Sequence, residues 1–63
     1  MSKIKDLRQQ TGLSQSRFAE KFHIKLRTLQ EWEYGRTTAP EYAVFMIDRI
    51  IELESQLGGD NNG

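Results

Sequence analysis

The sequence contains no cysteine, one histidine and one proline. Without cysteine it can form neither a disulfide framework nor a thiolate metal site, and a single histidine cannot build an imidazole cluster. No apolar run approaches the ~20 residues that a membrane span needs. We therefore expect no metal, no cofactor and no membrane partner. The first residues lack the apolar stretch of a secretory signal, which favours a cytoplasmic protein.

The chain is also short, with 63 residues. A chain of this size forms one small domain at most, and its stability must come from packing. It has no paired nucleophile and base and no glycine-rich phosphate loop. We therefore expect no enzymatic activity and no small-molecule substrate.

Charge is balanced in sum but not along the chain. Nine Lys and Arg face nine Asp and Glu, giving a formal net charge of zero. Residues 1 to 36 carry a net charge of +4, and residues 37 to 63 carry −4. This asymmetry favours one face that binds an anionic partner.

The apolar periodicity predicts an all-α fold of four helices and no strand. The expected helices span about residues 2 to 11, 15 to 22, 26 to 34 and 40 to 57. Gly12 and Gly35 are expected to end the first and third helices, and Ser14 to cap the second. Thr38 and Glu41 fit a capping box at the start of the fourth. We expect the domain to cover residues 1 to 57 and residues 58 to 63 to form a disordered tail.

Apolar side chains at helical spacing predict the core. The second helix is expected to bury Phe18, Ala19 and Phe22, and the third Leu29 and Trp32. The fourth helix is expected to cover the others with one stripe, formed by Ala43, Met46, Ile47, Ile50, Leu53 and Leu57. Val44 and Ile51 would widen that stripe on one flank. Phe45 points to nearly the opposite side.

Two short helices joined by a three-residue turn form the minimal helix-turn-helix. Several stretches then match one family: Leu13-Ser14-Gln15, Phe18-Ala19, Arg27-Thr28-Leu29, Trp32-Glu33-Tyr34-Gly35-Arg36 and Pro40. Over about residues 3 to 51 the chain resembles the Cro and lambda-repressor-like, or Xre-type, family. The resemblance implies a compact four-helix DNA-binding domain. It also implies that the helix at 26 to 34 enters the major groove, usually in a dimer.

Carried over residue by residue, the resemblance puts the base contacts near the start of that helix. They fall on Lys25, Leu26, Arg27 and Glu31. The guanidinium of Arg27 can donate two hydrogen bonds to guanine, and Leu26 can contact a thymine methyl group. Glu31 either accepts from a cytosine amino group or orients Arg27 as an exposed i,i+4 pair.

Gln15 matches the family position that binds a DNA phosphate at a helix start. Further phosphate candidates are Ser14, Ser16, Arg17, Thr28, Tyr34 and Arg36. A structural role explains two of them equally well, because Ser14 is also a helix cap and Arg17 is also a solvated charge.

His23 stands where the family usually has glycine, at a turn position that often needs a positive φ. A histidine reaches this geometry at a cost of about 1 kcal/mol. We interpret it as an exposed turn residue and not as a metal ligand.

The function predicted from the sequence is a sequence-specific regulator that binds double-stranded DNA, most simply a repressor. The alternative is a protein-interaction module that keeps the scaffold without reading DNA. We hypothesise that Phe45 with Val44 or Ile51 mediates homodimerisation. The alternative for Phe45 is a scattered surface aromatic, which needs no partner.

Overall fold

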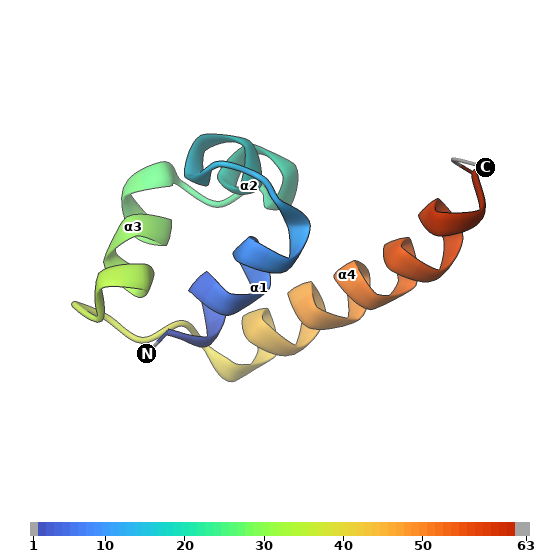
Figure 1. Cartoon of the computed structure of the whole chain (residues 1–63). Coiled ribbons are helices and arrows are strands. Elements are labelled where there is room, and N and C mark those ends of the chain that lie inside the picture. Colours follow the sequence, from blue (N-terminus) through green and yellow to red (C-terminus); the bar gives the residue numbers. More distant parts are fainter. Residues whose placement is uncertain (1, 62–63) are drawn as a thin grey trace.

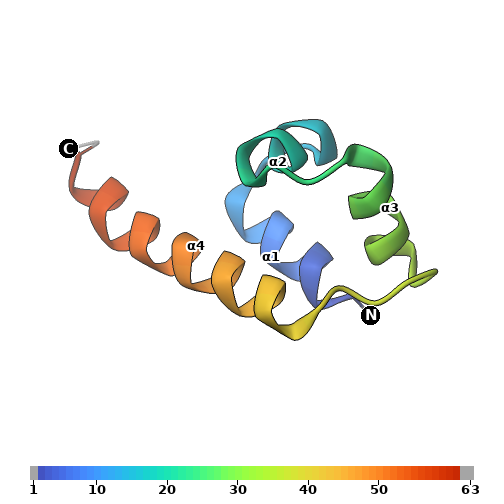
Figure 2. The same ribbon diagram turned by 180° about the vertical axis from the view of Figure 1, so that it is seen from behind.

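The computed structural model describes residues 2–61, and this part of the chain contains four helices and no strand. They are α1 (Lys3–Thr11), α2 (Gln15–Phe22), α3 (Leu26–Tyr34) and α4 (Glu41–Asn61). Helices α1, α2 and α3 form a compact body, and α4 packs along α1 and then projects past it (Figures 1 and 2). The all-α prediction is confirmed, with α2 and α3 forming the helix-turn-helix.

Side-chain caps begin the first two helices, and the cap of the second was predicted from the sequence. The Ser2 hydroxyl accepts a hydrogen bond from the amide of Lys5 at 3.3 Å. The Ser14 hydroxyl accepts one from the amide of Arg17 at 3.2 Å. Each cap satisfies one of the amides that a helix start leaves without a partner.

Residues in the left-handed conformation end three helices. Gly12 follows α1 with φ 76°, His23 follows α2 with φ 58°, and Gly35 follows α3 with φ 82°. Glycine adopts this conformation without a steric penalty, whereas histidine has a Cβ that resists it. The positive φ predicted at His23 is therefore confirmed.

The core lies where the four helices meet. Ile4 and Leu7 of α1, Phe18 of α2 and Leu29 of α3 are fully buried. The rings of Phe18 and Phe22 pack 4.7 Å apart between centroids. Trp32, half-buried on α3, packs against this cluster. The core predicted for α2 and α3 is thus present.

The start of α4 differs from the prediction. The carbonyl of Pro40 accepts the first helical bond, from the amide of Val44 at 3.1 Å. Pro40 is therefore the N-cap residue, and the helix begins at Glu41. Thr38 then lies two residues before the cap, and its side chain makes no hydrogen bond within residues 2–61, so the predicted capping box does not form.

The end of α4 also differs. The sequence predicts an end at Leu57, but the helix continues to Asn61. Glycine permits the left-handed conformation that ends a helix without requiring it, so a Gly-Gly pair can remain helical. Residues 62 and 63 of the expected tail lie outside the described residues.

The face that α4 turns to the body is the third difference. Ile47 is buried, and Val44 and Ile51 are half-buried against the core cluster. Met46, Ile50, Leu53 and Leu57 of the predicted stripe are instead exposed. The helix is apolar on two neighbouring sides, and periodicity alone does not determine which side meets the body. Val44 and Ile51 therefore pack on the chain's own core, while Phe45 remains exposed.

Candidate nucleic-acid interface

The start of α3 presents three predicted base-contacting side chains to solvent. Lys25 is its N-cap residue, with a side chain that makes no capping bond. Leu26 is exposed although it is apolar, and Arg27 is exposed beside it. None of the three is used by the core.

The outer side of α3 forms an open hollow. Its lining residues are Arg27, Gln30, Glu31, Tyr34 and Arg36. The ion pairs within residues 2–61 join Arg8 to Glu33, Lys21 to Glu54 and Arg49 to Glu52. Arg27 is therefore not held by Glu31 in the structure, and both side chains line the same accessible surface. Thr28, the remaining candidate on α3, is half-buried.

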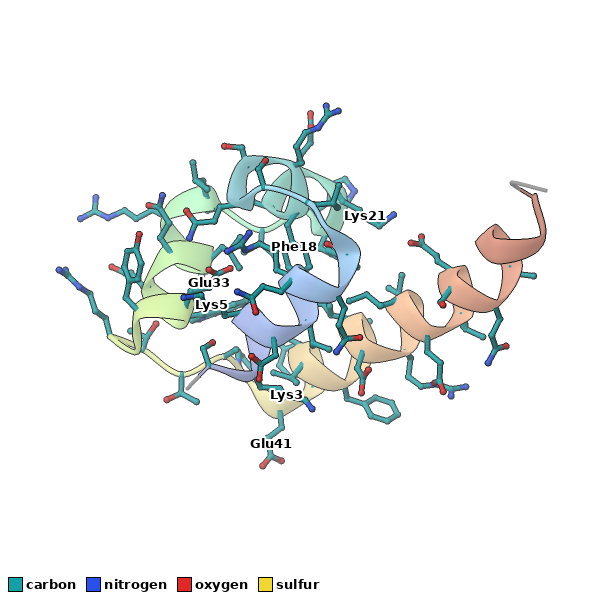
Figure 3. All side chains as sticks on the ribbon, in the orientation of Figure 1. Lys3, Lys5, Phe18, Lys21, Glu33 and Glu41 are labelled. Carbon is teal, nitrogen blue, oxygen red and sulfur yellow. The ribbon has the colours of Figure 1, made fainter. Side chains whose placement is uncertain are left out.

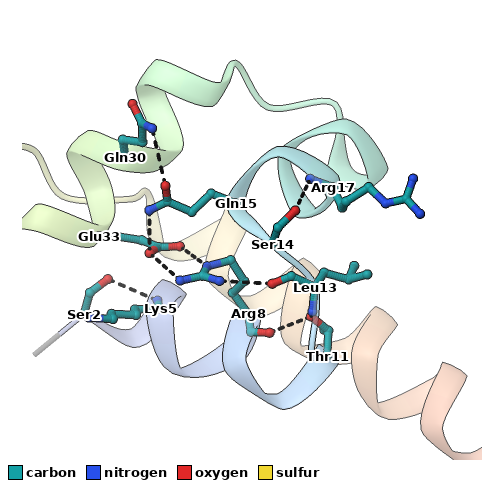
Figure 4. A network of polar contacts seen from close by, with 10 residues as sticks. All are labelled: Ser2, Lys5, Arg8, Thr11, Leu13, Ser14, Gln15, Arg17, Gln30 and Glu33. Carbon is teal, nitrogen blue, oxygen red and sulfur yellow. Dashed lines mark hydrogen bonds and ion pairs between the residues drawn. The ribbon is translucent and has the colours of Figure 1, made fainter.

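The start of α2 contributes a second set of candidates. The Ser14 side chain is occupied as a helix cap, as its structural alternative requires. Ser16 and Arg17 are exposed, and the Arg17 guanidinium points away from the neighbouring polar network (Figure 4). Helix α2 therefore presents amides, hydroxyls and one guanidinium at its positive end.

Gln15 connects the two helices. Its Nε2 donates to Glu33 Oε1 at 3.1 Å, and its Oε1 accepts from Gln30 Nε2 at 3.3 Å. Both partners belong to α3, so one amide fixes the start of α2 against α3 (Figure 4). The side chain predicted to bind phosphate is thus positioned by α3.

A salt bridge below Gln15 anchors this arrangement. Arg8 of α1 donates from Nε to Glu33 Oε2 at 2.7 Å and from Nη2 to Glu33 Oε1 at 3.1 Å. Its Nη1 donates to the carbonyl of Leu13 at 3.0 Å. The side chains are 17% and 1% exposed for Arg8 and Glu33. A single guanidinium therefore joins α1, the loop before α2, and α3.

The network also determines the protonation of its members. Burial by itself raises the pKa of Glu33, but hydrogen bonds from Arg8 and Gln15, with the charges of Arg8 and Lys5, outweigh burial and lower it. The hydrogen bond to Glu33 raises the pKa of Arg8 against the effect of burial. Both groups are thus held in their charged forms.

The sequence reasoning assigned no role to Arg8, Gln30 or Glu33. A signal was present for two of them. Arg8 stands four residues after buried Ile4, and Glu33 four residues after buried Leu29, so each lies on the inner stripe of its helix. A charge at such a position requires a partner. The role of Gln30 depends on the crossing of α2 and α3, which spacing alone does not give.

The burial of Glu33 leaves the outer surface of the helix-turn-helix positively charged. The outward charged side chains of residues 14 to 36 are Arg17, Glu20, Lys21, Lys25, Arg27, Glu31 and Arg36. Basic groups outnumber acidic ones, although the whole chain has no net charge. Lys3 and Glu41 lie at the edge of the body away from α2 (Figure 3). The surface formed by the starts of α2 and α3 and the outer side of α3 is therefore suited to an anion.

Two other kinds of site, a membrane span and a metal centre, are absent from residues 2–61. No helix there is long and apolar enough to cross a membrane. No group of three metal-ligating side chains is found in the same part of the chain.

Comparison with known proteins gives one match. A family model described as helix-turn-helix matches residues 4–58, which is most of the chain. No curated protein and no solved structure matches.

Proposed function

The chain belongs to the Cro and lambda-repressor-like, or Xre-type, helix-turn-helix family, and from that membership we propose that it is a sequence-specific regulator of transcription. The family is one of DNA-binding regulators and not of enzymes. The single observation that carries the proposal is the outer face of α3, where Lys25, Leu26 and Arg27 are exposed beside the positive end of α2.

In this proposal α3 lies in the major groove. Arg27 donates two hydrogen bonds to a guanine, and Leu26 contacts a thymine methyl group. Glu31, which shares a hollow with Arg27, accepts from a cytosine amino group. Lys25 binds a neighbouring base or phosphate.

The start of α2 binds the DNA backbone. Gln15 Nε2 has a second hydrogen beyond the one donated to Glu33, and the first amides of α2 point the same way as the helix dipole. Other phosphate contacts come from exposed side chains on the rim: Ser16, Arg17, Tyr34 and Arg36. Such contacts fix the register of α3 without reading sequence.

The regulator acts as a repressor in the cytoplasm. Two copies place their α3 helices about 34 Å apart, one turn of the double helix, on a two-fold operator. A complex of that size occludes a promoter.

The proposal is tested through Arg27. Selection of bound oligonucleotides from a random pool first gives the preferred site. Arg27→Ala should then reduce discrimination against a changed guanine by about 5-fold to 150-fold, since a bidentate contact is worth ~1 to 3 kcal/mol. Fluorescence anisotropy on matched and changed duplexes measures the ratio.

Lys3→Ala is the control, because Lys3 is an exposed cation outside this surface. It should leave the ratio unchanged. Full discrimination by Arg27→Ala would show that another residue reads the bases.

The second candidate function is a protein-interaction module, which the zero net charge favours. A salt titration separates the two. A DNA regulator loses affinity with a logarithmic slope near −0.9 for each phosphate that it neutralises. A module that does not read DNA gives no matched-site preference at any salt concentration.

A further inference from the structure

Helix α4 has an apolar face that its own chain does not cover. The face consists of Ala43, Met46, Ile50, Leu53 and Leu57, and we call it the α4 seam. Ala43 is half-buried, while Met46, Ile50, Leu53 and Leu57 are 55%, 37%, 46% and 67% exposed. All four long side chains are thus far more exposed than any residue of the core.

We propose that the α4 seam binds a second copy of this chain as a parallel two-stranded coiled coil. This proposal names the surface through which the two copies of the proposed regulator associate. Only the arrangement of the two copies on DNA rests on the proposed function. The spacing of the seam residues matches that of a coiled coil. The seam residues are separated by three, four, three and four positions, which is the heptad pattern with Ala43, Ile50 and Leu57 at a and Met46 and Leu53 at d.

The residue types at the a and d positions favour a two-stranded pair. Ile50 occupies the central a position and Leu53 the following d position. A β-branched residue at a with leucine at d favours two parallel strands over three or four. The partner with the matching pattern is another copy of α4.

The charges along the edges of the seam are complementary between two parallel copies. Arg49 occupies a g position and Glu54 the e position five residues later. In a parallel pair, Arg49 of one chain faces the partner's Glu54, and symmetry makes this contact twice. In an antiparallel pair, g positions face g positions and e positions face e positions, so Arg49 and the partner's Glu54 would lie on opposite edges and could not pair. The charges therefore select the parallel arrangement.

Both charged side chains are accessible for this contact. Arg49 pairs with Glu52 at 3.1 Å, and Lys21 pairs with Glu54 at 2.9 Å. All four side chains are well exposed, so each pair contributes little to folding and exchanges readily.

The body of the domain does not block the seam. At 100° per residue, the side of α4 that meets the body (Val44, Ile47 and Ile51) is centred roughly 110° from the seam. Two copies joined through the seam therefore hold their bodies on opposite sides of the pair. Phe45 lies roughly 120° from the seam in the other direction, so it takes no part.

The experiment measures mass in the absence of DNA. Sedimentation equilibrium of the whole chain should give a dimer at high concentration that dissociates on dilution. Leu53→Glu should weaken the dimer at least 100-fold, because it puts a charge at a d position. Phe45→Glu is the matched control, an equally drastic change at an exposed apolar residue of the same helix, and it should leave the dissociation constant unchanged.

Circular dichroism establishes that both variants fold, which their exposed positions lead us to expect. A parent chain that remains monomeric at every concentration would overturn the proposal. So would a Leu53→Glu variant that dimerises as well as the parent, or a Phe45→Glu variant that loses the dimer to the same extent.

A single cysteine tests the orientation, because the chain contains none of its own. Leu57→Cys places two thiols side by side in a parallel pair and should give a disulfide-linked dimer on oxidation. In an antiparallel pair, the two thiols lie toward opposite ends of the seam, roughly 15 to 30 Å apart, beyond the ~7 Å limit for a disulfide. A dimer that does not cross-link would overturn the parallel arrangement.

The measurements of mass and of DNA binding test the two proposals separately. A dimer that binds no matched duplex would contradict the proposed function and leave the seam intact. A chain that binds its site while monomeric would contradict the seam and the two-copy complex, and it would leave sequence-specific DNA binding intact.

Discussion

Glu33 is a carboxylate buried beneath the surface that we propose binds DNA. It accepts two hydrogen bonds from Arg8 and one from Gln15, so its charge is matched by donors on two other helices. A buried charge without donors would be costly, whereas this one has partners for both oxygens. The residue thus stabilises the crossing of α1, α2 and α3 and takes no direct part in recognition.

Glu33→Gln should destabilise the domain by about 2 to 3 kcal/mol. Loss of one member of a buried pair costs ~3 to 5 kcal/mol, and the partial exposure of Arg8 reduces that figure. Urea denaturation measures the loss. Glu20→Gln, on the exposed side of α2, is the control and should change stability by less than about 0.5 kcal/mol.

The same variant should alter the acid dependence of stability. The folded pKa of Glu33 lies below its ordinary value of 4.5, so the unfolded chain binds the proton first. Its contribution is therefore complete above pH 4.5 and is lost as the pH falls through the lowered folded pKa. Glu33→Gln should show a shallower loss of stability in this acid range. An unchanged slope would mean that other carboxylates dominate acid unfolding.

At the scale of the elements, the ends of α2 and α3 depend on three local signals. Ser14 caps one start, while His23 and Gly35 form left-handed ends. His23 is the only non-glycine residue with positive φ in the described part of the chain. The turn between the two helices therefore carries a strain that glycine would remove.

His23→Gly should stabilise the domain by about 0.5 to 1 kcal/mol. The left-handed conformation costs a residue with a Cβ ~1 to 2 kcal/mol, and the added freedom of the unfolded chain offsets part of the gain. Thermal unfolding measures the change.

Glu20→Gly provides the comparison, because a glycine introduced inside α2 should destabilise the domain by about 1 kcal/mol. A loss of stability in His23→Gly would show that the histidine ring makes a contribution of its own.

The elements differ in how far the sequence predicted them. Helices α2 and α3 match their expected bounds, because a cap, a left-handed residue and short amphipathic faces all agree there. The prediction of which side of α4 packs on the body was wrong. Val44 and Ile51 form one apolar stripe and Met46 and Ile50 form another beside it, and the sequence does not show which of the two is buried. The candidate DNA-contacting residues came from the family resemblance and stay a prediction, whereas the link from Gln15 to Gln30 needed the three-dimensional crossing of the two helices.

At the scale of the whole molecule, a dimer joined through the α4 seam should make thermal stability depend on concentration. Association stabilises the folded state by mass action. For a domain of this size, a tenfold rise in concentration above the dissociation constant should raise the Tm by roughly 3 to 5 °C. Scanning calorimetry at several concentrations measures the shift.

Leu53→Glu should show one Tm at all concentrations, whereas Phe45→Glu should follow the parent. A concentration-independent Tm in the parent would argue that each chain unfolds alone.

The separation of charge described in the sequence is also a separation in space. The basic side chains lie mainly on the body, and the exposed charged side chains of α4 are mostly acidic, so the molecule is an electric dipole with an acidic arm. In the field of a duplex such a dipole experiences a torque. The protein is therefore turned while it diffuses, with α3 leading and α4 trailing, so that a larger share of encounters begins in the orientation that the proposed complex needs.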